Sequence, residues 1–178
     1  MTILPRRFTR REMLRMLGIA GTGAVLPRTL VANYGPPPPT QLSDLSALTA
    51  TNPILISEDD PDQLRLYELI LNRANLKTMG TVSGVRTLEI CQNAPVSLLV
   101  SDIMKPEIDG FEILQRLRAN HATRRIPILF VSCILYDEQR AQFARDLGAD
   151  GYMVKPIWPS DLLTAVQTLL MQRGCWSA

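Results

Sequence analysis

The sequence predicts an α/β fold built on an open parallel β-sheet. Five short apolar segments alternate with five segments whose apolar residues recur at helical spacing, all within residues 53–172. Segments such as Ile54–Ile56 and Ile128–Val131 are apolar without a break, as expected for strands that are buried on both faces. Strands and helices that alternate in this way form a parallel sheet with helices covering both faces.

The first strand–helix pair has the clearest boundaries. Ile54–Ser57 is a short β-type run, and Asp60–Pro61 supplies an N-cap followed by a first-turn proline, which is typical of a helix start. Further along, Gly148 ends the fourth helix as a C-cap glycine. The expected strands cover residues 54–57, 77–82, 96–100, 126–131 and 152–154, and the expected helices cover residues 61–74, 85–92, 113–117, 138–147 and 161–171.

The composition excludes several classes of protein. Of the 178 residues, 46% are apolar and 20% are charged, which is typical of a globular protein and not of a disordered one. No apolar run reaches the roughly 18 residues that a membrane-spanning helix needs. The cysteines Cys91, Cys133 and Cys175 are far apart, and His121 is the only histidine. These counts exclude a zinc module, a disulfide scaffold and a Cys/His nucleophile.

The N-terminal part of the chain differs in charge from the rest. Residues 1–40 carry six arginines and one acidic residue, whereas the remainder carries 13 basic and 16 acidic residues. Arg10–Arg11, followed by the glycine-rich apolar stretch Met16–Leu26, resembles a twin-arginine export signal. An amphipathic basic helix and a misassigned start codon are the alternatives. We expect a leader over residues 1–35 that is not part of the fold.

A spacer and a short tail flank the predicted domain. Pro36–Pro39 is a run of four prolines, which favours a stiff polyproline II spacer. Polar residues follow it, so we expect a linker over residues 36–52, the domain over residues 53–172 and a tail over residues 173–178. No basic stripe runs through the domain, so we expect no direct binding of nucleic acid.

Polar side chains follow four of the five predicted strands. Glu58–Asp59, Asp102, Ser132 and Lys155 come directly after the first, third, fourth and fifth strands. In open parallel sheets, ligands bind beyond the carboxyl ends of the strands. The sequence therefore predicts that an acidic pair, a single acid, a hydroxyl and an ammonium group meet at one edge of the sheet.

These residue types together indicate phosphoryl chemistry. The carboxylates of Glu58, Asp59 and Asp102 repel one another unless a cation lies among them, and an all-oxygen ligand set favours Mg²⁺. A metal ion and the Lys155 ammonium would neutralise the oxygens of an incoming phosphoryl group. A carboxylate held in line with that group can become an acyl phosphate.

Five groups of residues resemble the receiver domain of response regulators, in the order and at the spacing of that family. They cover about residues 53–172 and are Glu58–Pro61, Asp102–Pro106, Asp109–Gly110, Ser132–Cys133 and Gly148–Pro156. The resemblance implies a flavodoxin-like, doubly wound sheet of five parallel strands in the order 2-1-3-4-5. It also implies a cis bond between Lys155 and Pro156.

The resemblance assigns the acceptor and the metal ligands. Asp102 would be the phosphoacceptor and would also ligate Mg²⁺. Asp59 would ligate the ion directly, Glu58 through a water molecule and Met104 through its backbone carbonyl. A turn role is all that we assign to Asp109–Gly110.

The resemblance also assigns the remaining site residues. Lys155 would contact the phosphoryl oxygens, Ser132 would be the switch hydroxyl and Tyr152 the switch aromatic that moves inward behind it. Lys105 stands where many family members carry an apolar residue, and Ile157–Trp158 replaces the commoner phenylalanine after Lys-Pro. We expect neither departure to affect the chemistry.

The function that follows is a stand-alone receiver in two-component signalling. It would take a phosphoryl group from a histidine kinase or a histidine phosphotransfer protein onto Asp102 and catalyse only its own phosphorylation and dephosphorylation. The helix 4–strand 5–helix 5 face would then bind an output protein or form a homodimer. The alternatives are an interaction module that is not phosphorylated, and a metal-dependent phosphatase. The phosphatase is disfavoured because Met104 stands where such enzymes carry a second acid.

The leader and the chemistry point to different locations. The acceptor site needs a donor that ATP supplies, which favours the cytoplasm, whereas the leader indicates export or a misassigned start.

Overall fold

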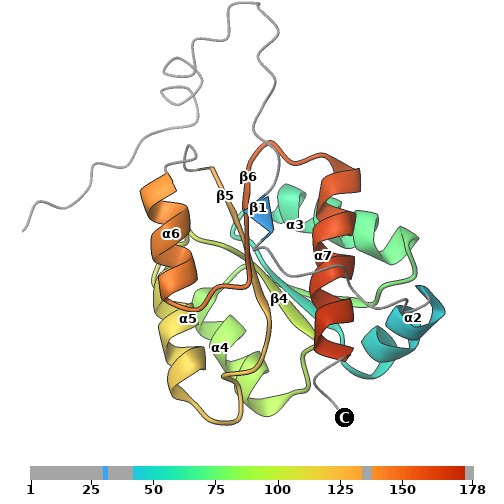
Figure 1. Cartoon of the computed structure of the whole chain (residues 1–178), viewed down its shortest axis with the longest axis horizontal. Coiled ribbons are helices and arrows are strands. Elements are labelled where there is room, and N and C mark those ends of the chain that lie inside the picture. The colour runs from blue at the N-terminus through green and yellow to red at the C-terminus, as the bar shows by residue number, and fades with distance from the viewer. Residues whose placement is uncertain (1–29, 32–41, 134–137, 175–178) are drawn as a thin grey trace, which may run out of the picture.

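The chain folds around one central sheet with helices on both faces, as the sequence predicts (Figure 1). The computed structural model describes residues 30–31, 42–133 and 138–174. The strands are β1 (Leu30–Val31), β2 (Ile54–Ser57), β3 (Thr78–Thr81), β4 (Leu98–Asp102), β5 (Ile128–Ser132) and β6 (Gly151–Val154). The helices are α2 (Leu42–Thr51), α3 (Pro61–Arg73), α4 (Gly84–Asn93), α5 (Gly110–Ala119), α6 (Glu138–Asp146) and α7 (Pro159–Gly174).

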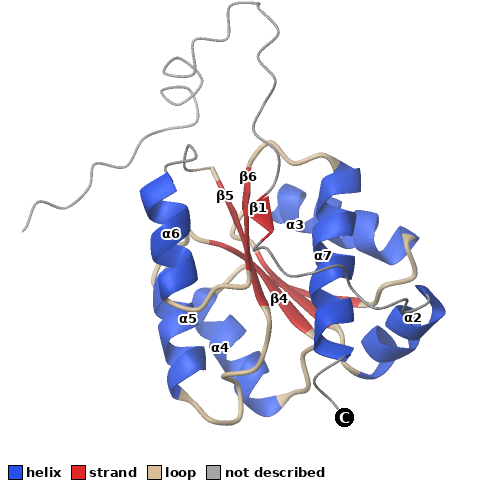
Figure 2. Ribbon diagram, viewed as in Figure 1, coloured by secondary structure: helices blue, strands red, loops and turns tan. Residues whose placement is uncertain are grey.

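The order of the strands is β1-β6-β5-β4-β2-β3. Strands β2 to β6 pair with one another in parallel, while β1 pairs with β6 in an antiparallel register. In the numbering of the five predicted strands, the order of β2 to β6 is 2-1-3-4-5, so the prediction of a flavodoxin-like parallel sheet is confirmed (Figure 2). Strands β4 and β5 begin and end up to two residues later than expected, so Asp102 and Ser132 are the last residues of their strands.

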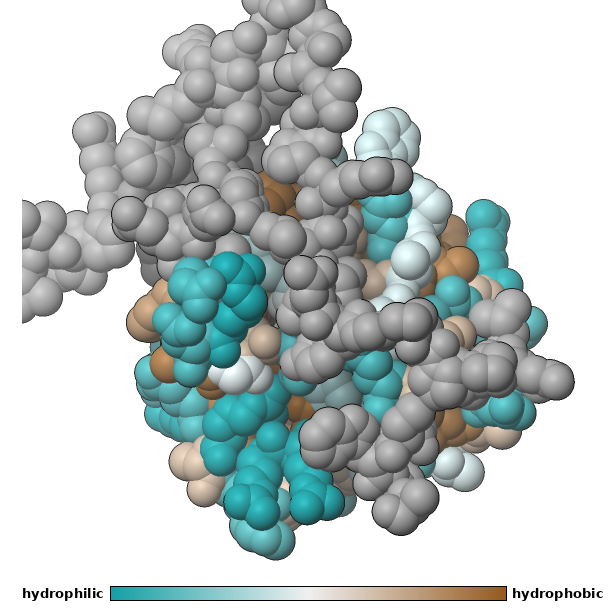
Figure 3. Space-filling view, in the orientation of Figure 1, coloured by the Kyte–Doolittle hydropathy of each residue, from teal (hydrophilic) through white to brown (hydrophobic). Residues whose placement is uncertain are grey.

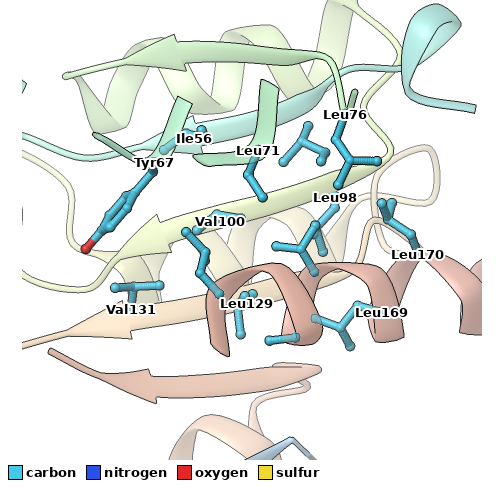
Figure 4. Close-up of a cluster of buried hydrophobic side chains, with 14 of the residues drawn as sticks. Ile56, Tyr67, Leu71, Leu76, Leu98, Val100, Leu129, Val131, Leu169 and Leu170 are labelled. Carbon is cyan, nitrogen blue, oxygen red and sulfur yellow. The ribbon is translucent and has the colours of Figure 1, made fainter. Parts of the chain in front are cut away.

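Two hydrophobic clusters hold the helices against the sheet. Successive residues of a strand point to opposite faces, and neighbouring core positions accordingly alternate between the clusters. One cluster packs the sheet against α2, α3 and α7, and Figure 4 shows its side chains lying between the strands and α7. The other packs it against α4, α5 and α6. The outer surface in the space-filling view mixes hydrophilic and apolar side chains (Figure 3).

Helix α2 corrects the prediction of a linker over residues 36–52. Residues Leu42–Thr51 form a helix, and Leu45 is only 2% exposed within the cluster that contains α7. The buried Thr49 hydroxyl donates to Leu45 O at 3.0 Å and accepts from Lys77 N at 3.1 Å. The helix was missed because polar residues surround its few buried positions.

Strand β1 corrects the prediction that residues 1–35 lie wholly outside the fold. Leu30–Val31 pairs with β6 in an antiparallel register, Leu30 opposite Tyr152 and Val31 opposite Gly151. The twin-arginine-like motif lies outside the described residues. Among the helices that the structure describes, none has both the length and the apolar character needed to cross a membrane.

An arginine joins α5 to the loops at the amino ends of β5 and β6. Arg118 donates to Gly148 O at 2.7 Å, to Ile126 O at 2.8 Å and to the Asp150 carboxylate at 2.8 Å. The same carboxylate oxygen accepts from Ile128 N at 2.8 Å. This network fixes the amino end of the sheet, opposite the edge where the strands end in polar residues.

Replacing Arg118 tests that network. Arg118→Met should lower the free energy of unfolding by about 2–3 kcal/mol, because it leaves several partly buried acceptors without their charged donor. Urea denaturation measures the change. The matched control is Arg116→Met on the same helix, since the exposed Arg116–Glu112 pair should contribute less than about 1 kcal/mol. Equal losses in the two variants would contradict the role of the network.

Candidate functional site

The carboxyl ends of the parallel strands bring the predicted site residues together. One carboxylate oxygen from each of Glu58, Asp59 and Asp102 lies within 4.8 Å of the other two. The Lys155 ammonium donates to Glu58 Oε2 at 2.7 Å and to Asp102 Oδ2 at 3.2 Å. Glu58 and Lys155, 97 residues apart in the chain, therefore meet through the order of the strands.

Only one of the three consecutive acidic residues before α3 is used to start the helix. Asp60 is the N-cap, and its side chain accepts from the backbone N–H groups of Asp62 at 3.0 Å and Gln63 at 3.3 Å. Pro61 occupies the first turn. Because Asp60 alone supplies the cap, Glu58 and Asp59 are not needed to start the helix and can turn toward Asp102.

Burial and opposite charge set the electrostatics of the site. Glu58 is 1% exposed and Asp102 is 7% exposed, whereas Asp59 is exposed. Burial raises the pKa of Glu58 above its usual range, and the Lys155 ammonium offsets part of the rise. Burial alone would lower the pKa of Lys155, but the carboxylates of Asp102 and Glu58 raise it above its ordinary value. The ammonium therefore stays charged among the acids.

The donor set fits a hard divalent cation. All three clustered donors are carboxylate oxygens. Mg²⁺ prefers oxygen ligands, and it binds through a few carboxylates and retained waters, without a full set of protein ligands. Glu58 Oε1 is buried and has no hydrogen-bond partner among the described residues. An unpaired buried carboxylate oxygen is costly, and a cation or its bound water would satisfy it. Glu58, Asp59 and Asp102 are thus the residues that would hold Mg²⁺.

Met104 lies beside the acceptor carboxylate through its backbone. Its N–H donates to Asp102 Oδ1 at 3.3 Å, and its side chain is 54% exposed. The predicted use of its carbonyl as a metal ligand stays a prediction. The Lys155–Pro156 peptide bond is cis, which confirms the expectation drawn from the resemblance.

The two predicted switch residues are buried on the neighbouring strands β5 and β6. Ser132 follows Val131, whose register partner on β4 is Asp102, and it is fully buried. Tyr152 is 4% exposed and belongs to the cluster under α4, α5 and α6. Side chains alternate along a strand, so Ser132 points to the same face of the sheet as Phe130 and its neighbour Tyr152. Their switching role stays a prediction.

Lys105 contacts the backbone of the predicted acceptor, a contact that the sequence does not predict. It is 9% exposed, and its ammonium donates to Ser101 Oγ at 2.8 Å and to the backbone oxygen of Asp102. Burial lowers the pKa of Lys105 to about 8, against the opposing effect of the carboxylates of Asp102 and Glu58. The sequence contains a signal that could have pointed to Lys105. The chain has 16 arginines and only three lysines, and one of these lysines stands three positions after Asp102, where many family members carry an apolar residue.

The parallel sheet of this order, with acids and a lysine at its carboxyl edge, defines the class of receiver domains. The "Response regulator receiver domain" family model matches residues 54–167. The chain belongs to this family, whose members act in two-component systems. Receiver domains typically use Mg²⁺ in an acidic pocket, and Glu58, Asp59 and Asp102 form an acidic cluster at this edge.

Curated relatives are similar over the same region. An uncharacterized 14.6 kDa protein of Leptolyngbya boryana is 31% identical over 64% of this chain and 86% of its own length. The DNA-binding dual master transcriptional regulator RpaA of Synechocystis sp. is 32% identical over 66% of this chain, but the match covers 48% of that regulator. The chain thus spans about half the length of the first curated relatives that it matches.

Solved receiver domains have the same fold. A putative response regulator from Chloroflexus aurantiacus is 30% identical with a TM-score of 0.61, over 67% of this chain and 97% of its own. The signal receiver domain of a histidine kinase from Syntrophus aciditrophicus is 28% identical with a TM-score of 0.63, over 71% and 94%.

Removing the exposed acid tests the metal site. Asp59→Asn should lower the affinity for Mg²⁺ by at least about tenfold, the loss that follows even from changing a residue outside the ligand set. Isothermal titration with MgCl₂ measures the affinity. Asp62→Asn is the control, because Asp62 is an exposed acid on the first turn of the same helix and should leave the affinity unchanged. An Asp59→Asn affinity equal to that of the wild type would rule out this ligand set.

Proposed function

We propose that the chain accepts a phosphoryl group on Asp102 from a phosphohistidine donor, either a histidine kinase or a histidine phosphotransfer protein. The observation that carries the proposal is the Lys155 ammonium 3.2 Å from Asp102 Oδ2, beside a cluster of three carboxylates. No other arrangement in the described part of the chain joins a nucleophilic carboxylate, a cation and a metal-ligand set. The proposed reaction needs a donor that ATP supplies, which is the reason to place it in the cytoplasm.

The chemistry follows from these groups. An Asp102 carboxylate oxygen attacks the phosphorus of the donor, the P–N bond to the donor imidazole breaks, and its electrons leave with that nitrogen. Lys155 neutralises phosphoryl oxygens as they approach, and phosphoryl transfer needs mostly such positioning and charge. A bound Mg²⁺ supplies further neutralisation of the same oxygens. Glu58, Asp59 and Asp102 would hold it, with the Met104 carbonyl as a proposed fourth ligand.

A switch would connect the acceptor with a binding face. Phosphorylation replaces the single negative charge of the Asp102 carboxylate at the end of β4 with the about −1.5 to −2 charges of a phosphoryl group. The buried Ser132 ends the neighbouring strand β5. We assign the response to Ser132 and to Tyr152, which lies on the neighbouring strand β6. The affected surface is the face formed by α6, β6 and α7, which would bind an output protein or a second copy of the chain.

Replacing the acceptor tests the proposed reaction. Acetyl phosphate with Mg²⁺ should increase the mass of the wild-type protein by about 80 Da, the mass of one added phosphoryl group. Asp102→Asn should abolish the gain, and Lys155→Met should slow it at least about 100-fold, as removal of one charge-stabilising group does. Intact-protein mass spectrometry follows both.

The control for this experiment is Asp146→Asn, an exposed acid on α6, which should gain mass like the wild type. A mass gain that persists in Asp102→Asn would disprove the assignment of the acceptor. A wild-type protein that gains no mass would favour the alternative of a receiver fold that acts only as an interaction module.

The lifetime of the phosphorylated state is a separate test. Met104 is apolar and exposed beside Asp102. We assign Met104 and Ile134, two residues after Asp102 and Ser132, to an apolar rim around the acceptor; Ile134 lies outside the described residues. An apolar rim cannot orient an attacking water, so we expect a long-lived acyl phosphate. Met104→Asn should shorten the half-life about tenfold, a change of about 1.4 kcal/mol in the barrier, in decay experiments after removal of the donor. An unchanged or longer half-life would contradict the role of Met104.

A further inference from the structure

A second ammonium group, that of Lys105, is bonded to residues of the acceptor strand β4. Lys105 is buried, and both of its hydrogen bonds go to neutral acceptors, the Ser101 hydroxyl and the backbone oxygen of Asp102. Among the described residues, no carboxylate lies within ion-pair distance of its ammonium. Lysine is almost never buried unless it is paired, because an unpaired buried charge is strongly disfavoured. The position of Lys105 therefore needs an explanation.

The surroundings of Lys105 form a buried polar layer beneath the acid cluster. Ser101 on β4 is the register partner of Ser57 on β2, and both point to the face that α4 and α5 cover. Ser57 is hydrogen-bonded to Thr87 of α4 at 2.6 Å, and Ser101 donates to Asp102 O at 2.9 Å. The ammonium thus reaches Asp102 through its main chain, while Lys155 reaches it through its carboxylate.

The loop after β4 has other hydrogen bonds that hold it in place. Gly110 N donates to Ile103 O at 2.9 Å, and Ile108 N donates to Pro106 O at 2.9 Å. A methyl group on Gly110 would lie 2.9 Å from Asp102 O, so α5 begins in close contact with the acceptor backbone. These contacts do not involve Lys105, so the loop has hydrogen bonds that hold it in place without a buried charge.

We infer that Lys105 is a positioning residue of the phosphoryl-transfer site, whose buried positive charge at the Asp102 backbone favours the phosphorylated state of that side chain. The inference rests on the proposed function of Asp102. Phosphorylation makes the acceptor side chain more negative, and a fixed positive charge in a medium of low polarity favours the more negative state. The same charge repels a divalent cation in the acid cluster.

The charge of Lys105 favours the phosphorylated state and disfavours a bound cation. A packing defect would not change the two affinities in opposite directions, so the two explanations can be distinguished. Lys105→Met keeps the length of the side chain and removes its charge. It should weaken the binding of fluoroberyllate, an anionic phosphoryl analogue, about fivefold to tenfold in saturating Mg²⁺, and it should tighten the binding of Mg²⁺ alone by a similar factor, since the charge acts with opposite sign on the two ions. Isothermal titration measures both affinities. Lys105→Gln keeps a hydrogen-bond donor and should behave like Lys105→Met.

The free energy of unfolding gives an independent readout. If the charge serves the site, Lys105→Met should unfold at the same urea concentration as the wild type or at a higher one, because it removes a buried charge. If Lys105 is a structural tie, the variant should unfold at a lower concentration. Lys77→Met is the matched control, since Lys77 is an exposed lysine at the opposite edge of the sheet and should change neither affinity.

The outcomes separate this inference from the proposed function. Four outcomes would each overturn the role of the charge. In Lys105→Met they are a weakening of both affinities, no change in either affinity, or a lower urea midpoint. In Lys105→Gln it is binding like that of the wild type. A wild-type protein that binds no fluoroberyllate with Mg²⁺ would overturn the proposed function itself, and this inference with it.

Discussion

The repulsion among three carboxylates at one edge of the sheet is the constraint on which the site depends. Glu58 and Asp102 are buried and lie with Asp59 within 4.8 Å, an arrangement that is unfavourable without a cation. The Lys155 ammonium bonds to two of the three acids. Its position after β6 follows from the order of the strands, so the fold itself delivers the opposing charge.

The sheet tolerates this charged edge because its other end and both faces are firmly packed. The strand interiors are buried in two hydrophobic clusters, and the Arg118 network closes the loops at the amino ends. One carboxylate oxygen of Glu58 finds no hydrogen-bond partner at the carboxyl edge within the described part of the chain. Unsatisfied buried polar groups and strained residues cost free energy and cluster at functional sites, where a bound ion or a charged ligand can satisfy them.

The parallel sheet and the site were predictable because their signals are local and strong. Continuous apolar runs mark buried strands, and polar residues at the ends of such runs mark the edge where they meet. Helix α2 and strand β1 were not predictable in this way. The burial of Leu45 depends on helix α7, and the pairing of Leu30–Val31 depends on an open edge of β6. The sequences of these two short segments do not indicate which element each of them packs against or pairs with.

Lys105 shows why a sequence pattern can mislead about one residue. A lysine in a loop is usually solvated, whereas this one is 9% exposed and bonds to Ser101 and to the Asp102 backbone. A compact ammonium suits the two acceptors available there, whereas the planar guanidinium of the far commoner arginine needs more partners. A buried charge without a carboxylate partner is costly, and ionisable groups in such perturbed environments cluster at functional sites. The charge therefore belongs with the chemistry of Asp102 and not with the packing of the core.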